Sequence, residues 1–140
     1  METGGVMSEE VWFRHEKLDV TQESIEYYLA VRRCTARFPP VERFELTSQL
    51  NRAALPVSSN IAEGIGRATP RDRIRFLDMA NGSLLESVTQ LTIAARLGYV
   101  CDEDHQSLRR MADALCRQLA GLRRHDQYRR SPTSTPPPSP

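Results

Sequence analysis

Apolar residues recur every three or four positions along most of the chain, which predicts four amphipathic helices. The first helix is expected over about residues 17–36, and it carries two adjacent apolar faces. One face holds Leu18, Ile25 and Leu29 with Arg32, and the other holds Val20, Tyr27, Val31 and Cys34. Pro39 and Pro40 end this helix, because proline disfavours the helical conformation of the residue before it.

The second helix is expected to begin near residue 41 or 42 and to contain the unusual stretch LPVSSNIAEGIGR at residues 55–67. Its proline, serines and glycines are poor helix formers, and its two glycines raise the alternative of a phosphate-binding loop. Its apolar residues keep helical spacing, however: Leu55, Val57, Ile61 and Ile65. The glycines also lack the partners that dinucleotide-binding loops and P-loops require. We therefore predict a helix with a kink at Pro56 and with Ser58 or Ser59 near the freed carbonyls.

The ends of the third and fourth helices carry recognisable capping residues. Thr69 is a preferred N-cap, and Pro70 suits the first helical position after it. Gly98 follows the last apolar residue of the third helix and favours the left-handed conformation that ends many helices. We expect Asp102 to cap the fourth helix, and we expect that helix to fray near Arg124.

Four helices with short connections predict an all-α fold, an antiparallel up-down-up-down four-helix bundle. We place this bundle at residues 14–125 and a flexible N-terminal segment at residues 1–13. Residues 126–140 end in SPTSTPPPSP and are predicted to form a disordered Pro/Ser-rich tail, because this composition offers no apolar surface to bury.

The net charge is only +1, but the charges are unevenly distributed. Residues 1–30 carry seven acidic residues against two basic ones, whereas residues 104–140 carry seven arginines against three aspartates. Arginine stays charged and binds phosphate oxygens in a fork, so arginine-rich surfaces favour nucleic acid or acidic partners. An arginine bias can equally reflect genome composition.

The candidate phosphate-binding arginines fall into two groups, one around the turn between the second and third helices and one along the fourth helix. The first group is Arg52, Arg67, Arg71, Arg73 and Arg75. The second group is Arg109, Arg110, Arg117, Arg123, Arg124, Arg129 and Arg130. The cluster from Arg123 to Arg130 is the preferred candidate, because Asp126 is the only acidic residue within it.

No pattern of catalytic or metal-binding residues stands out. No histidine follows a glutamate by three positions, as di-metal bundles require, and no nucleophile motif is present. We expect no enzyme activity, no metal and no cofactor. The chain lacks an apolar membrane-spanning run and a secretory signal, and its three cysteines are widely spaced. We therefore expect a cytoplasmic protein with free thiols and no membrane association.

Several polar residues fall on faces of the second and third helices that we expect to be partly buried. On the second helix they are Gln49, Asn60 and Glu63, and on the third Ser83 and Glu86. Because buried polar groups need partners, we predict a hydrogen-bonded network between the two helices. Such a network would fix helix register or a subunit interface without performing chemistry.

Three blocks of sequence carry a resemblance to a known family. They are LTSQLNRAALPVSSNIAEG at residues 46–64, RIRFLDMANGSLLE at residues 73–86 and AARLGYV at residues 94–100. The chain resembles four-helix bundle proteins encoded by intervening sequences inside bacterial 23S rRNA genes. That family includes the accessory variability (Avd) proteins of diversity-generating retroelements. The resemblance spans roughly residues 13–99 and weakens through the fourth helix.

The resemblance implies a homo-oligomer, commonly a pentamer, with a basic surface. Accessory variability proteins bind a reverse transcriptase and its template RNA and support cDNA synthesis without catalysing it. We therefore expect a non-catalytic accessory protein that binds RNA and possibly a reverse transcriptase through its arginines. The alternative is a structural oligomer that binds a protein partner and has no role with nucleic acid.

Overall fold

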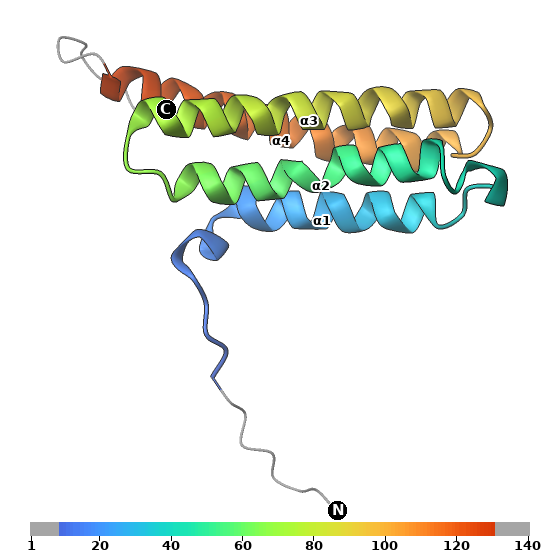
Figure 1. The fold of residues 1–140 in the computed structure, drawn as a ribbon, viewed down its shortest axis with the longest axis horizontal. Coiled ribbons are helices and arrows are strands. Elements are labelled where there is room, and N and C mark those ends of the chain that lie inside the picture. The colour runs from blue at the N-terminus through green and yellow to red at the C-terminus, as the bar shows by residue number, and fades with distance from the viewer. Residues whose placement is uncertain (1–8, 131–140) are drawn as a thin grey trace, which may run out of the picture.

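The computed structural model describes residues 9–130, without the side chain of residue 130, and these residues form a bundle of four long helices. The helices are α1 (Asp19–Thr35), α2 (Leu46–Ile65), α3 (Pro70–Arg96) and α4 (Asp102–Arg130). Two short 3₁₀ helices, η1 (Arg14–Lys17) and η2 (Pro40–Glu42), precede α1 and α2. Successive helices run in opposite directions (Figure 1). The predicted all-α four-helix bundle is confirmed; residues 1–8 and the predicted tail beyond residue 130 lie outside the described residues.

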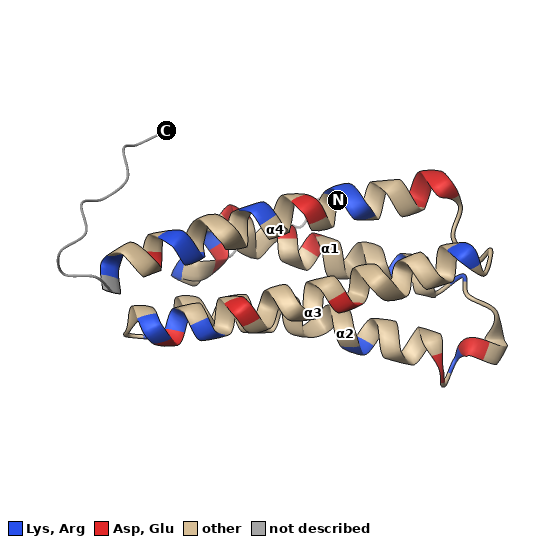
Figure 2. Ribbon diagram, turned by 90° about the horizontal axis from the view of Figure 1, so that it is seen from above, with Lys and Arg blue, Asp and Glu red and all other residues tan. Residues whose placement is uncertain are grey.

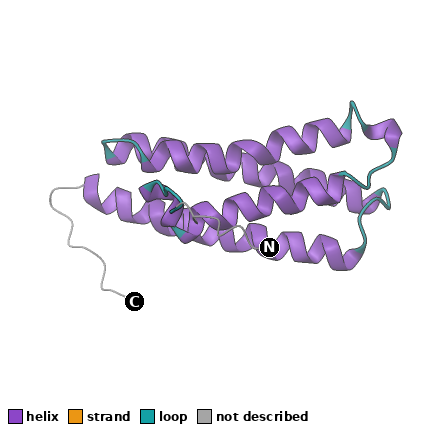
Figure 3. Ribbon diagram, turned by 90° about the horizontal axis from the view of Figure 1, so that it is seen from below, coloured by secondary structure: helices purple, strands orange, loops and turns teal. Residues whose placement is uncertain are grey.

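The four helices surround one apolar core, and short loops connect them (Figure 3). Helices α2 and α4 each pack against both α1 and α3, so the bundle is approximately square in section. The largest side chains that are fully buried in this core are Tyr27, Leu50, Ile61, Leu84, Leu91 and Leu115. All four helices contribute to this set, which is what helical apolar periodicity produces when each stripe faces the centre.

Helix α1 buries only one of its two apolar faces. Val20, Tyr27, Val31 and Cys34 lie in the core. Leu18, Ile25 and Leu29 are 42%, 37% and 42% exposed on the outside of the helix. Helical spacing identifies residues that share a face, but it does not say which of two neighbouring faces points inward.

Two hydrogen bonds between side chains join α1 to its neighbours inside the bundle. The hydroxyl groups of Tyr27 and Ser87 lie 2.7 Å apart and link α1 to α3. Burial raises the pKa of Tyr27 to about 12, although its bond to Ser87 acts in the opposite direction. Thr35 donates a hydrogen bond of 2.9 Å to the side-chain oxygen of Asn51 on α2. Because buried hydroxyl groups need partners, these bonds favour one register of α1 against α2 and α3.

The ends of α3 follow the sequence prediction, whereas the start of α2 does not. The Thr69 hydroxyl accepts a hydrogen bond from the Asp72 backbone N–H, and Gly98 ends the helix with a φ of +82°. Helix α2 begins at Leu46 instead of residue 41 or 42. The backbone of Glu45 is not helical there, and the Glu42 carboxylate accepts a hydrogen bond from the backbone N–H of Leu46. This carboxylate satisfies one of the unpaired donors at the helix start.

Helix α4 begins and ends differently from the prediction. The Cys101 carbonyl accepts the His105 backbone N–H, so Asp102 lies in the first turn and is not the cap. The helix continues to Arg130, so the expected fraying near Arg124 is wrong and residues 126–130 belong to the bundle. The physical reason is the tertiary packing of Asp126, which is only 5% exposed.

Helix α2 runs through the proline- and glycine-rich stretch without interruption, as the apolar spacing predicts. The Ser58 and Ser59 hydroxyls both donate to the Leu55 carbonyl, at 3.3 and 3.5 Å. Gly64 lies where α2 crosses α3: a β-carbon there would be 3.0 Å from the Phe76 β-carbon and 3.4 Å from the Arg73 carbonyl oxygen. The first glycine of the pair therefore permits close helix packing, and the suspected phosphate loop is part of a helix.

We expect Gly64→Ala to lower the free energy of unfolding by about 1 to 3 kcal/mol, because the added methyl group is forced against α3. Gly66→Ala is the matched control, since a β-carbon at Gly66 would be at an ordinary 3.6 Å from its nearest neighbours. Urea denaturation of both variants measures the difference. Equal stability of the two variants would show that α2 and α3 are not in close contact at this point.

Candidate nucleic-acid interface

The candidate arginines divide into those that are bound within the protein and those that are not. Arg67, Arg73, Arg109, Arg117 and Arg123 each make a hydrogen bond or ion pair with another side chain. Within residues 9–130, no hydrogen bond or ion pair engages the exposed side chains of Arg52, Arg71, Arg75, Arg110, Arg124 and Arg129. The side chain of Arg130 is not described. Arginines of the second group keep their donors available for a phosphate.

Arg73 is part of the internal structure. Its Nε donates to the Asp126 carboxylate at 3.0 Å, and Nη1 donates to the Arg67 carbonyl at 2.8 Å. The side chains of Arg73 and Asp126 are 16% and 7% exposed. This ion pair joins the start of α3 to the last turns of α4, so we leave Arg73 out of the phosphate-binding set. Sequence reasoning had treated Asp126 as a residue of the tail.

The Phe76 ring contacts two arginines near the turn between α2 and α3. The guanidinium groups of Arg67 and Arg75 lie over its ring, 4.6 and 5.0 Å from the centroid. Arg67 also forms an exposed ion pair of 2.9 Å with Glu63, one turn earlier on α2. Cation–π contacts hold an arginine side chain without using its hydrogen-bond donors, so Arg75 is positioned but still able to bind an anion.

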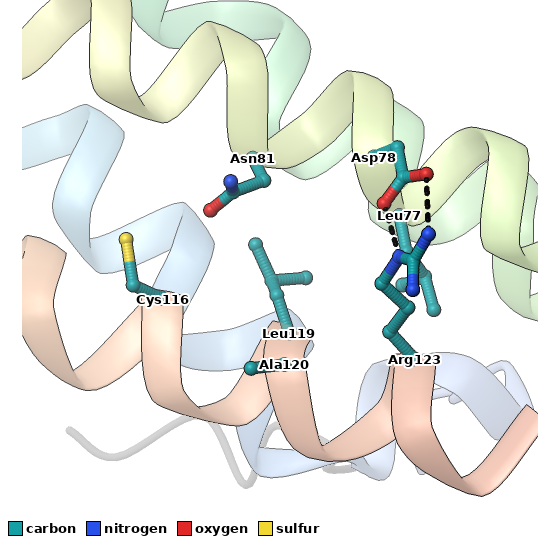
Figure 4. A pocket seen from close by; sticks show the side chains of 7 residues that line it. All are labelled: Leu77, Asp78, Asn81, Cys116, Leu119, Ala120 and Arg123. Carbon is teal, nitrogen blue, oxygen red and sulfur yellow. Dashed lines mark hydrogen bonds and ion pairs between the residues drawn. The ribbon is translucent and has the colours of Figure 1, made fainter. Parts of the chain in front are cut away.

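Arg123 on α4 binds Asp78 on α3 through two nitrogens, at 2.7 and 3.4 Å. Figure 4 shows this pair beside a cavity of about 110 Å³ that lies between the two helices. The hydrogen bond and the charge of Asp78 both raise the pKa of Arg123 above its usual value. Cys116 and Asn81 line the same cavity, together with Leu77, Leu119 and Ala120. The Arg123–Asp78 pair therefore links α4 to α3 at the edge of this cavity.

Five exposed arginines gather at the end of the bundle where α2 ends, α3 begins and α4 ends. This surface, here called the basic end, consists of Arg67, Arg71, Arg75, Arg124 and Arg129. Figure 2 shows basic positions on both α3 and α4 at this end and acidic positions at the start of α4, at the opposite end. Two elements far apart in sequence thus form one basic surface, because α3 packs against α4 and the buried pair of Arg73 and Asp126 joins them at this end.

The remaining candidate arginines lie elsewhere. Arg52 is exposed on α2, and Arg117 pairs with Asp113 one turn earlier on α4. Arg109 donates to the Thr92 hydroxyl at 3.3 Å, near the start of α4, and Arg110 is exposed beside it. The structure does not bring these four arginines to the basic end.

The polar network predicted between α2 and α3 is wrong. Gln49, Glu63 and Glu86 are exposed, and Asn60 and Ser83 are only half-buried. Within the described chain, no hydrogen bond joins the α2 members to the α3 members; Glu86 instead accepts from Gln90 at 3.5 Å. The α2 side chains that are fully buried are apolar, such as Leu50, Ala54 and Ile61. The buried hydroxyl pair of Tyr27 and Ser87 was missed, although both residues fall within the apolar spacing of their helices.

Residues 9–130 contain neither a cluster of metal ligands nor a membrane-spanning helix. Nowhere in this part of the chain do three His, Cys, Asp or Glu side chains gather closely enough to hold a metal ion. None of the helices in the same range has the length and apolar character needed to cross a membrane. Cys34, Cys101 and Cys116 are free.

Comparison with known proteins gives a family and a fold. A structure from Bacteroides thetaiotaomicron, a protein of unknown function from the S23 ribosomal protein family, aligns with a TM-score of 0.67 and 19% identity. That alignment covers 74% of this chain and 97% of the other, and at this identity it supports the fold alone. A search of curated proteins gave no match. The family model for the 23S rRNA-intervening sequence protein matches residues 16–121. The chain therefore belongs to the 23S rRNA-intervening sequence protein family.

Proposed function

We propose that this protein is a non-catalytic, homo-oligomeric accessory factor that binds RNA through its basic end. The observation that carries the proposal is the gathering of Arg71, Arg75, Arg124 and Arg129 at one end of the bundle without an internal hydrogen bond or ion pair. Such groups can bind phosphate oxygens and release counterions from the RNA, with little direct reading of bases.

Assembly would multiply this surface. One basic end offers few phosphate contacts, but several linked copies would raise the effective concentration of each contact after the first has formed. The resemblance to accessory variability proteins supports a homopentamer as the form of assembly. It also supports a reverse transcriptase as the protein partner wherever the gene lies in a diversity-generating retroelement.

A structural oligomer without an RNA role is the second candidate, and exposed apolar side chains on the outside of the bundle favour it. Leu18, Ile25 and Leu29 line the outer face of α1. Met79 and Ile93 on α3 are 49% and 47% exposed, and Leu97, directly after α3, is 54% exposed. Apolar groups that recur along one helix face are typical of protein–protein contacts.

Fluorescence anisotropy with a labelled single-stranded RNA and a labelled hairpin separates the two functions. The RNA-binding proposal predicts binding at low salt that weakens steeply as salt is added, by about 0.7 log units of affinity per log unit of salt for each single-strand phosphate contacted. Absence of binding at low salt to both RNAs would leave the structural oligomer as the better account.

A further inference from the structure

The chain presents a short apolar arm and an apolar groove that its own arm leaves empty. The arm is Val11–Trp12–Phe13, and the groove lies between the start of α1 and the second half of α4. We propose that the arm of one copy docks into the α1–α4 groove of a second copy. This inference rests on the homo-oligomer of the proposed function, and it names the contact that builds that oligomer.

Three consecutive apolar side chains of the arm face solvent. Val11, Trp12 and Phe13 are 88%, 47% and 67% exposed. Two aromatic rings and a branched aliphatic side chain in sequence are costly to leave in water, and aromatic side chains dominate the energetics of protein interfaces. Binding in an apolar groove would remove these side chains from water and so stabilise the segment.

A local turn aims the arm away from its own bundle. The Phe13 backbone N–H donates to the Glu16 carboxylate, and the Glu16 N–H donates to the Phe13 carbonyl, both at 3.0 Å. The Phe13 ring also stacks on His15, 6.3 Å between centroids. These contacts fix the chain at the start of η1, and the segment before it extends away from the helices (Figure 1). The geometry favours docking on another molecule over folding back.

The groove suits an aromatic side chain. It has a volume of about 360 Å³ and is lined by Leu18, Asp19, Val20, Gln118, Gly121 and Leu122. A β-carbon at Gly121 would meet nothing within 4 Å, so the missing side chain leaves part of the groove open. Val20 belongs to the core, so an inserted ring would contact ordered side chains of the bundle.

Exposed arginines flank the groove on α4, although the groove lining itself includes the acidic Asp19. Glu9 and Glu10 directly precede the arm. Arg117 and Arg124 lie four residues before and three residues after Gly121, which places them on the same side of α4 as the groove. Both arginines are exposed, but Arg117 already pairs with Asp113 on the same helix. A docked arm would bring its two glutamates toward Arg124, which would then serve the contact between copies and leave Arg71, Arg75 and Arg129 as the phosphate-binding arginines of the basic end.

Arm-into-groove contact joins different surfaces of the two copies. Contacts of this head-to-tail kind close into a ring when the rotation between copies allows it, or into a pair that exchanges two arms. Each copy both donates an arm and receives one, so every groove in a closed assembly is filled. The contact is therefore compatible with a cyclic oligomer of the whole chain.

Trp12 is the only tryptophan in the chain, so its emission reports directly on the arm. The test combines analytical ultracentrifugation with tryptophan emission of the full chain over a range of concentrations. We expect association and a blue shift of emission to rise together. Trp12→Ala and Gly121→Leu should each weaken association by about 30-fold or more, the effect of removing a central interface residue.

Gly82→Leu on the outer face of α3 is the matched control, because a β-carbon there also meets nothing within 4 Å. It should leave association unchanged. Three results would overturn the proposal: a Trp12 emission that stays unshifted as the oligomer forms, a blue shift already complete in the monomer, or a Gly121→Leu variant that associates as tightly as Gly82→Leu. A wild-type chain that remains monomeric overturns both the arm contact and the homo-oligomer, whereas RNA binding is tested separately by anisotropy.

Discussion

Asp126→Ala should lower the free energy of unfolding by about 3 kcal/mol or more. The change removes the carboxylate that pairs with Arg73 at 3.0 Å and leaves a guanidinium group with 16% exposure without its counter-charge. Nη2 of Arg73 is already buried without a hydrogen-bond partner, so the altered site has little means of compensating. Urea denaturation at pH 7 measures the effect.

Asp113→Ala is the matched control for this prediction. Asp113 pairs with Arg117 at the same 3.0 Å distance on the same helix, but the two side chains are 61% and 80% exposed. Exposed pairs contribute little, so stability should hardly change. Replacing both members of the buried pair, as in Arg73→Met with Asp126→Leu, should recover much of the loss. If Asp126→Ala were as stable as Asp113→Ala, the last turns of α4 would not be anchored to α3.

The anchoring of α4 illustrates what sequence reasoning could not provide. Apolar spacing stops before Asp126, so local pattern favoured fraying near Arg124. The helix continues to Arg130 because a contact across 53 residues of sequence holds it. Long-range ion pairs of this kind have no periodic signal, whereas the capping residue Thr69 and the terminating Gly98 act locally and were predicted correctly.

The wrong prediction of a polar network has the same cause, because it also depended on long-range packing that local spacing does not show. Helical spacing correctly grouped Gln49, Asn60 and Glu63 on one side of α2, but it could not say whether that side faces α3 or solvent. The structure gives the answer: Gln49 and Glu63 are exposed, and Asn60 is half-buried. Residues 46–64, which contain these polar residues, are one of the blocks that carry the family resemblance. The resemblance predicted the fold correctly, whereas the hydrogen-bonded network inferred from helical spacing was wrong.

The triple variant Arg71→Gln, Arg75→Gln, Arg129→Gln should bind single-stranded RNA on the order of 100-fold more weakly at about 0.1 M salt. Each of these side chains is exposed at the basic end and lacks an internal hydrogen bond or ion pair. Removing three positive charges removes three phosphate contacts, each of which gains from counterion release. Fluorescence anisotropy with one labelled RNA measures the change.

A second triple variant controls for the loss of net charge. Arg33, Arg43 and Arg96 are exposed toward the opposite end of the bundle, and changing all three to glutamine removes the same total charge. We expect this variant to retain most of the RNA affinity, because the proposal places phosphate contact at the basic end. Circular dichroism and thermal unfolding should show that both triple variants remain folded.

The salt dependence of RNA binding, compared between the wild-type chain and the basic-end triple variant, tests the central claim most directly. If Arg71, Arg75 and Arg129 contact phosphates, the log–log slope of affinity against salt should become shallower by about 2 for each protomer engaged. The opposite-end triple variant should keep the wild-type slope. Equal slopes for the wild-type chain and the basic-end variant would contradict RNA binding through this surface.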